Sequence, residues 1–227
     1  MPVKDDMLHP FNSRVEVNMI RNAGYSRFKP IPPVDVIINE RTSRCRHIVN
    51  ILDLSEVISS LHLSQWLIHF ERMSFAEQGS SEQSTRVLIS IHGAGLSNII
   101  FLQPGSTLIE LMHPLLRAPF YRFLSLYSSL NYILIRDVKS LSDSCSIQRT
   151  AWSPYIQPNL IVNVTTILTT ITNLFSVSPN ERMLTVSDGS DVNCSHKQVT
   201  QIIWIGFNSV VIRMNQRLYL HEDIRWK

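Results

Sequence analysis

Short apolar runs, rich in valine and isoleucine, alternate with polar stretches along residues 34–175 of the chain. Runs of this kind are typical of strands that are buried on both faces of a parallel sheet. Five of them are predicted as strands: residues 34–39, 65–70, 87–91, 107–111 and 131–135. The segments between them must then supply the connections that join parallel strands.

Several of these connecting segments have helical periodicity. Residues 53–61 carry apolar side chains at helical spacing, and Asp53 stands at the predicted N-cap. Helices are also predicted over residues 96–102, 120–127 and 159–175. The crossover helix expected within 76–86 should be short or poorly packed, because the polar residues there offer no apolar face. Alternating strands and helices predict an α/β fold with a mostly parallel sheet.

The same pattern divides the chain into three predicted parts. Residues 1–33 show no clear period and end in a proline-rich segment, which predicts a linker or the end of a preceding domain. Residues 34–175 form the predicted α/β domain. Residues 176–227 are a tail without a predicted fold, although 202–214 is an apolar, β-branched run.

The stretch at 87–111 reads as strand, glycine turn, helix and second strand. The first strand ends at His92, Gly93 and Gly95 allow backbone conformations that a β-carbon would forbid, and Ala94 keeps the turn small. A helix that begins directly after such a turn presents N–H groups and a positive dipole end, where phosphate binds well. Glu110, near the end of the second strand, is a candidate for contacting sugar hydroxyls.

A second candidate segment is the loop 40–47, ERTSRCRH, which holds three arginines and follows the first predicted strand. It is either a solvated turn or a basic loop at the crevice that the glycine turn also faces. Open α/β sheets bind ligands at the carboxyl ends of their strands, which favours the second interpretation.

Composition limits the classes of function. The chain has 227 residues, 44% hydrophobic and 17% charged, so it can bury an ordinary core. Its net charge of +3 comes from scattered residues, and no nucleic-acid partner is expected. No apolar stretch is long enough to span a bilayer, and residues 1–6 do not resemble a signal peptide. Membrane attachment is expected only through an N-terminal anchor that this sequence lacks.

Few residues suggest metal or disulfide chemistry. The three cysteines, Cys45, Cys145 and Cys194, have no metal-type spacing, and we predict neither a zinc site nor a disulfide framework. The sequence contains no Asp-x-Asp motif in the candidate region, so no metal and no cofactor are predicted. Sequons at Asn163 and Asn193 would matter only in the secretory pathway.

Two blocks of the sequence resemble glycosyltransferase family 61. Arg41-Thr42, followed by RHIVN at 46–50, is similar to the family's arginine-rich block, and HGAGLSN at 92–98 is similar to its H-G-A-x-L block. The family includes protein O-mannose N-acetylglucosaminyltransferase, EGF-domain O-GlcNAc transferase and β-1,2-xylosyltransferases. The resemblance covers residues 34–137 and implies a Rossmann-like domain that is one half of a GT-B-like enzyme.

The resemblance implies a role for each matching residue. Arg41 and Arg46 would hold the diphosphate of the donor, residues 92–95 would form the phosphate turn, and Glu110 would contact the ribose. His92 is the candidate catalytic residue, since an imidazole can donate to an oxygen that gains charge as the glycosidic bond breaks. Each has a plainer alternative as a surface arginine, a strand-end histidine or a solvated carboxylate.

The implied activity is inverting transfer from a UDP-sugar, UDP-GlcNAc or UDP-xylose, to a protein or glycan acceptor in the endoplasmic reticulum or Golgi lumen. The preceding half of such an enzyme is absent from this sequence, so we expect a fragment, or an inactive nucleotide-sugar-binding or interaction remnant without turnover. An esterase is less favoured because the sequence has no Gly-x-Ser-x-Gly elbow, and an oxidoreductase because the third fingerprint glycine is missing.

Overall fold

The computed structural model describes residues 11, 13–42, 45–113, 116, 119–141, 159–176, 199–206, 209–214 and 217–222. The chain divides into two compact units, Met1–Leu168 and Thr169–Lys227. The candidate residues all lie in the first unit.

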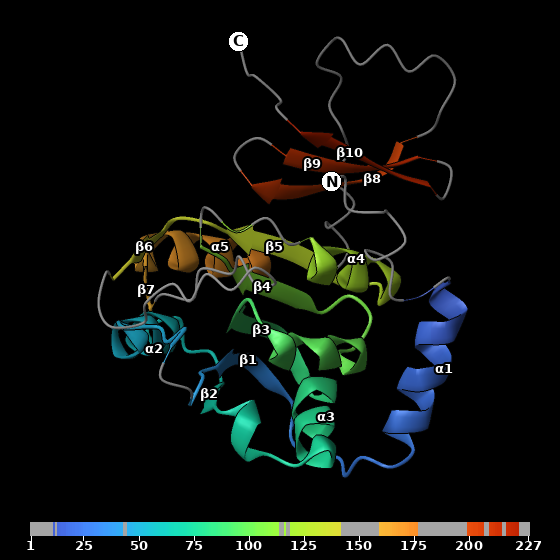
Figure 1. Cartoon of the computed structure of the whole chain (residues 1–227), viewed down its shortest axis with the longest axis horizontal. Coiled ribbons are helices and arrows are strands. Elements are labelled where there is room, and N and C mark those ends of the chain that lie inside the picture. The colour runs from blue at the N-terminus through green and yellow to red at the C-terminus, as the bar shows by residue number, and fades with distance from the viewer. Residues whose placement is uncertain are drawn as a thin grey trace, which may run out of the picture. The chain divides into compact units, whose positions relative to one another are not determined.

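A parallel sheet of five strands forms the centre of the first unit (Figure 1). Its strands are β1 (Val34–Asn39), β2 (Gln65–Ile68), β3 (Thr85–Ile91), β4 (Thr107–Leu111) and β5 (Asn131–Ile135). They lie in the order β2-β1-β3-β4-β5, and every neighbouring pair is parallel. The predicted α/β class with a Rossmann-like parallel sheet is confirmed.

Helices connect these strands and cover both faces of the sheet. They are α1 (Arg14–Tyr25), α2 (Ile51–Ser59), α3 (Phe75–Gln83), α4 (Phe120–Tyr127) and the 3₁₀ segments η2 (Phe70–Arg72) and η3 (Ala94–Phe101). The chain leaves β1 through α2 toward β2, and later returns through α3 to β3 on the other side of β1. Right-handed crossovers in opposite directions put α2 and α3 on opposite faces, as Figure 1 shows.

The core consists of the apolar runs that the sequence places in the middle strands. Many large apolar side chains in the described ranges are almost completely buried. They include Ile37, Ile38, Leu54, Ile58, Leu88, Ile89, Leu96, Ile99, Leu102, Leu108, Ile109 and Leu111. Burial on both faces explains why β1, β3 and β4 read as continuous rather than alternating apolar runs.

Smaller elements follow the central sheet. β6 (Val138–Ser140) pairs with β7 (Leu160–Val162) in an antiparallel ladder, so the segment predicted as a helix from 159 begins as a strand. α5 (Val164–Ser176) follows, and the boundary between the two units falls inside it. In the second unit, β8 (Val199–Gly206), β9 (Ser209–Met214) and β10 (Arg217–Glu222) form an antiparallel sheet in the order β10-β9-β8.

Helix α1 lies in a segment where the sequence showed no period. Its buried residues are Val17, Arg21 and Gly24, which have helical spacing but mixed chemistry. The Arg21 guanidinium is buried and donates to the carbonyls of Ile100 and Ser128, at 2.6 Å each. A hydrophobicity pattern cannot reveal a buried face of which only one member is a large apolar residue.

One prediction about a helix end needs correction, and the expected short helix after residue 75 is present. α2 begins at Ile51 with Asn50 at the N-cap, so Asp53 lies in the first turn and is not the cap. α3 is short, as expected, but its small residues lie buried rather than loosely packed. A β-carbon added to Gly79 would overlap the Phe28 ring, so this helix approaches its neighbour more closely than an ordinary apolar face would allow.

Candidate functional site

A row of polar side chains crosses the sheet near the carboxyl ends of its central strands. Asn39 of β1 pairs in register with Ser90 of β3, which pairs with Glu110 of β4. All three are buried, and Asn39 Nδ2 donates to Ser90 Oγ at 3.0 Å. Asn39 Oδ1 accepts from the backbone N–H of Phe70 at 3.1 Å, which draws the chain out of the ladder and explains why β2 ends before residue 70.

From β1 the chain first connects to β2 on one side and later to β3 on the other side. The order of the strands therefore changes direction between β1 and β3. In an open α/β sheet, the crevice at such a switch point is where ligands bind. A small hollow is present at this point. Its lining residues are Asn39, Glu40, Arg41, Phe70, Glu71, Ser90, Ile91 and Gly95.

Two arginine side chains from the loop after β1 meet the glycine turn after β3. A β-carbon added to Gly93 would overlap Arg41 Nη1 and would lie 3.1 Å from Arg46 Nη1. The Gly93 backbone is extended, with φ 164°, which any residue can adopt. Glycine at this position therefore leaves room for two guanidinium groups to approach the turn closely, and the expected backbone restriction is incorrect.

Unlike Gly93, Gly95 does not lie against the two arginines, and Ala94 begins the segment that follows the turn. A β-carbon at Gly95 would lie 3.5 Å from Asn39 Nδ2, which is ordinary contact. The backbone reason that the sequence offered for Gly95 is therefore also incorrect, since the residue has no positive φ. Ala94 begins η3, so the predicted helix after the turn is present in the tighter 3₁₀ form.

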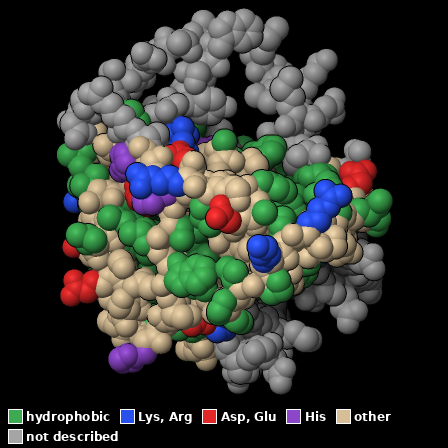
Figure 2. Space-filling view, turned by 90° about the horizontal axis from the view of Figure 1, so that it is seen from below, with side chains coloured by type: hydrophobic (Ala, Val, Ile, Leu, Met, Phe, Trp, Pro, Cys, Tyr) green, Lys and Arg blue, Asp and Glu red, His purple; other side chains and the backbone are tan. Residues whose placement is uncertain are grey.

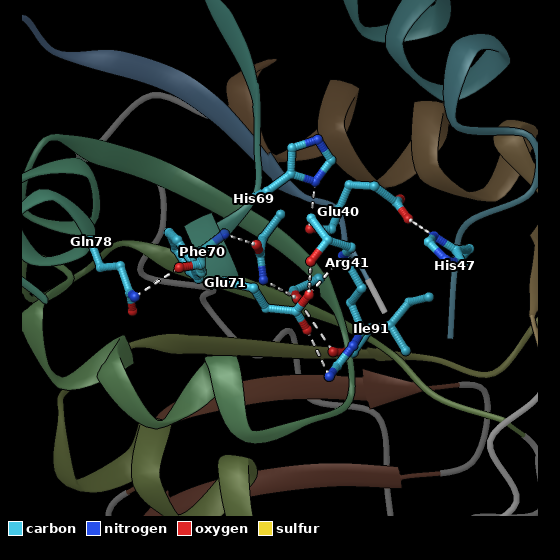
Figure 3. Close-up of polar contacts among 11 residues, drawn as sticks. Glu40, Arg41, His47, His69, Phe70, Glu71, Gln78 and Ile91 are labelled. Carbon is cyan, nitrogen blue, oxygen red and sulfur yellow. Dashed lines mark hydrogen bonds and ion pairs between the residues drawn. The ribbon is translucent and has the colours of Figure 1, made fainter. Parts of the chain in front are cut away.

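Glu71 holds Arg41 in place. Arg41 Nη2 lies 2.9 Å from Glu71 Oε1, and the other oxygen of Glu71 accepts from the backbone N–H of Thr42 at 2.7 Å. Figure 3 shows Arg41 and Glu71 facing each other, with Ile91 beside them. Because one carboxylate bridges the loop and the arginine, the guanidinium is oriented before any ligand arrives.

The backbone conformation and the surroundings of Arg46 are energetically unfavourable. Its backbone is left-handed, with φ 66°, although it carries a β-carbon. Its Nε is buried and has no hydrogen-bond partner among the described residues. Burial, followed by the nearby charge of Arg41, lowers the pKa of Arg46, and Glu71 and Tyr121 act in the opposite direction. Strain and an unmatched donor at one residue are typical of functional sites.

His92 and Glu110 meet on the neighbouring side of the site. Glu110 is fully buried, and one carboxylate oxygen accepts from His92 Nδ1 while the other accepts from the Tyr132 hydroxyl. The ring of Tyr121 lies against the His92 imidazole, with centroids 5.1 Å apart. Since both its oxygens are engaged and neither is exposed, the geometry argues against the expected ribose contact of Glu110.

A second histidine cluster borders the hollow. Glu40 Oε1 lies 2.9 Å from His47 Nδ1, and the Glu40 backbone carbonyl accepts from His69 Nδ1 at 3.1 Å. Figure 3 shows the Glu40 carboxylate turned toward His47 and away from Arg41. Figure 2 shows histidine, basic and acidic side chains gathered near the upper left of the face that it draws.

The structure corrects one prediction about covalent chemistry. Cys45, directly before Arg46, is disulfide-bonded, whereas the sequence predicted no disulfide framework. Three scattered cysteines give no spacing rule, so only the folded chain could reveal the bond. Within the described ranges, no group of three histidine, cysteine or acidic residues is arranged to hold a metal ion. Among those same residues, no helix combines the length and apolarity needed to cross a membrane.

Sequence reasoning named Arg41, Arg46, His92 and residues 93–95, and the structure brings the two arginines together at the turn. It missed Asn39, Glu71 and Tyr132, which orient those residues. A polar residue near the end of an apolar run was the available signal for Asn39.

Residues 2–109 match the family model described as Glycosyltransferase 61, a region that runs through both the arginine loop and the glycine turn and ends in β4. No curated protein matches the chain. Tyr121 and Tyr132 lie beyond the matched region, although their side chains contact residues of the site.

Proposed function

We propose, from the premise that residues 2–109 belong to the glycosyltransferase 61 family, that this chain binds the diphosphate of a sugar donor at the carboxyl ends of β1 and β3. The proposed donor is a UDP-sugar, with N-acetylglucosamine or xylose as the sugar, and the proposed acceptor is a protein or glycan hydroxyl. The observation that carries the proposal is the convergence of Arg41 and Arg46 on Gly93.

Electrostatics explains why this convergence favours a diphosphate. Two guanidinium groups beside one backbone turn repel each other, and the one carboxylate that pairs with either of them among the described residues is Glu71, on Arg41. An anion with several oxygens relieves the repulsion and accepts from both planar groups at once. A buried Arg46 Nε without a partner offers one more donor in the same place.

His92 is proposed as the donor to the leaving diphosphate. Its Nδ1 is engaged by Glu110, so Nε2 is the ring nitrogen that remains for a ligand. Transfer of the sugar leaves extra negative charge on the diphosphate, and a donor fixed at that position stabilises this charge as it develops. Gly93, Ala94 and Gly95 are proposed as the turn that faces the phosphates.

The proposed compartment is the lumen of the endoplasmic reticulum or Golgi. Disulfides persist in oxidising compartments and are rare in the cytosol, and Cys45 is disulfide-bonded. The family's enzymes typically act in the secretory pathway, which agrees with this bond.

Titration calorimetry of the chain with UDP, ADP, NAD and uridine tests the proposal. We expect UDP to bind most tightly. Charge-assisted hydrogen bonds contribute about 1.5–3 kcal/mol, so Arg46→Ala should weaken UDP binding by about tenfold or more. Uridine, which lacks phosphate, should lose little affinity in this variant.

Arg86→Ala is the matched control, because Arg86 pairs with Asp35 at 2.9 Å at the amino end of the same strands. It should leave UDP binding unchanged. Equal or absent binding of UDP, ADP and NAD would contradict the proposal. Donor binding without sugar transfer to any acceptor would instead support the alternative of a binding remnant without turnover.

A further inference from the structure

We propose that Glu110 and Tyr132 hold His92 so that its imidazole takes up one proton when the diphosphate of a nucleotide sugar binds. This inference rests on the proposed function and adds two positioning residues and a linked proton to it. It begins from a hydrogen-bonded chain of three side chains on neighbouring strands: Tyr132 on β5, Glu110 on β4, and His92 directly after β3.

The hydrogen bonds among these three side chains fix the tautomer of His92. Burial, with a further contribution from Glu110, raises the pKa of Tyr132 well above its usual range, so its hydroxyl stays protonated and donates. Glu110 therefore accepts from Tyr132 with one oxygen and from His92 Nδ1 with the other. The Nδ1 proton stays in this bond, and Nε2 is the atom that gains or loses a proton.

In the unliganded chain, the charged groups around His92 have opposite effects on the protonation of its imidazole. The groups that face or adjoin the site include Glu110 on β4, Tyr132 on β5, Tyr121 on α4, and Arg41 and Arg46 in the loop after β1. Arg122 on α4 and Arg136 after β5 are the charged groups that act on Tyr132, at the other end of the hydrogen-bonded chain. A buried carboxylate favours the imidazolium, whereas two guanidinium groups at the adjacent glycine disfavour a third cation.

Binding of the diphosphate changes this balance. Its negative charge neutralises the field of the two arginines, and the Glu110 carboxylate then favours a positive His92. The solvent supplies one proton, which bonds to Nε2, and no bond in the ligand breaks in this step. The resulting Nε2–H donates to a phosphate oxygen, which is the state required to stabilise the leaving group.

The experiment is titration calorimetry with UDP-N-acetylglucosamine in two buffers of different ionisation enthalpy at the same pH. This probe is chosen because its diphosphate has no group that titrates near neutrality. A difference in apparent enthalpy between buffers gives the number of protons taken up. We expect uptake approaching one proton, and a Kd that rises with pH by up to about tenfold per unit.

Three variants and one control separate the roles. His92→Asn and Glu110→Gln should abolish the uptake, the first because the titrating ring is gone and the second because an amide cannot favour the imidazolium. Tyr132→Phe leaves the Glu110 carboxylate without its neutral donor, so the free site should already hold the proton and uptake should fall. His62→Asn is the matched control, because His62 is exposed and in a left-handed conformation that asparagine tolerates.

The outcomes are distinguishable. Absence of binding by the folded parent chain would overturn the proposed function itself. Binding without proton uptake, or uptake that persists in His92→Asn, would overturn this inference and leave the proposed function standing. For Tyr132→Phe, a lower melting temperature with unchanged proton uptake would mean that this residue is only structural, and would overturn its positioning role.

Discussion

Arg46 combines features that disfavour the unliganded chain. A left-handed backbone costs a residue with a β-carbon about 1–2 kcal/mol, and Arg46 has φ 66°. Its buried Nε lacks a partner among the described residues, and Arg41 adds repulsion. Such a residue persists only where the surrounding structure or a ligand offsets its cost, which is why we place it at the centre of the anion site.

The strain at Arg46 can be measured apart from its charge. Arg46→Gly and Arg46→Ala both remove the guanidinium, but only glycine adopts φ 66° without a steric penalty. We expect the glycine variant to be more stable than the alanine variant by about 1–2 kcal/mol, measured by urea unfolding. Both should lose UDP affinity alike. Equal stability of the two variants would show that the loop relaxes and that the backbone is not strained.

Glu82 makes the stability of the folded chain depend on pH. Its carboxyl is fully buried in α3, and neither oxygen has a partner among the described residues. Burial raises the pKa of Glu82 well above its ordinary value of 4.5. The folded state therefore binds this proton more tightly, so the contribution of Glu82 to stability is fully present below pH 4.5 and is lost as the pH rises through the raised pKa.

Glu82→Gln should remove that loss. We expect the melting temperature of the variant to exceed that of the parent at pH 8 by at least about 2–4 °C, the shift for 1 kcal/mol in a chain of this size. The gap should shrink as the pH falls toward 4.5. Glu56→Gln, on the exposed side of α2, is the control and should show no such trend. A constant gap at all pH values would contradict the argument.

At the scale of single elements, α3 shows how a helix without an apolar face can still pack. Its first turn is closed by a capping box between Ser74 and Glu77, and its buried residues are the small Gly79, Ser80 and Ser81 together with Glu82. Phe28 fills the space that these residues leave, and its ring makes edge contacts with Phe75 and Phe101 at 5.8 and 4.9 Å between centroids. The backbone of α3 therefore lies close to Phe28, and this close approach provides the packing that larger side chains provide in other helices.

Gly79→Ala tests this packing. In an ordinary helix the change would stabilise by about 0.5–1 kcal/mol. Here the new β-carbon would lie 2.6 Å or less from atoms of the Phe28 ring, so we expect destabilisation of about 1–3 kcal/mol, measured by urea unfolding. The double variant with Phe28→Leu should regain part of the loss. Stabilisation by Gly79→Ala alone would show that the Phe28 ring moves freely.

The elements differ in how well their sequences predicted them. β1, β3 and β4 were predicted because strands buried on both faces are continuously apolar. α1 was not, because an arginine and a glycine occupy its buried face. The residues of the candidate site likewise differ in how well the sequence predicted them. Arg41 and Arg46 follow a strand directly, whereas Tyr132 reaches Glu110 through a strand register that periodicity does not specify.

At the scale of the whole first unit, the topology assembles the site from two loops that are distant in sequence. The arginine loop follows β1 and the glycine turn follows β3, and the two strands are neighbours because the chain reverses direction between them. The sheet can fix the ends of the loops but not the middle of the arginine loop. Cys45 is disulfide-bonded at that point, next to Arg46, and this bond restrains the loop where the strands cannot.

Loss of this bond should therefore weaken donor binding through Arg46. In Cys45→Ser the arginine must be ordered when the ligand binds, and ordering a long side chain costs about 0.5–1.5 kcal/mol. We expect UDP affinity to fall about twofold to tenfold, measured by calorimetry, with circular dichroism confirming an intact fold. Reduction of the parent chain should produce the same loss, and reduction of the variant no further loss.

A double-mutant cycle identifies the route of this effect. If the disulfide acts by positioning Arg46, Cys45→Ser should cost little additional UDP affinity once Arg46 is already alanine, because the side chain that the bond orients is gone. The two changes would then be strongly non-additive in binding, although each could still lower the melting temperature separately. Additive losses of affinity would mean that the bond supports the crevice by another path than the positioning of Arg46.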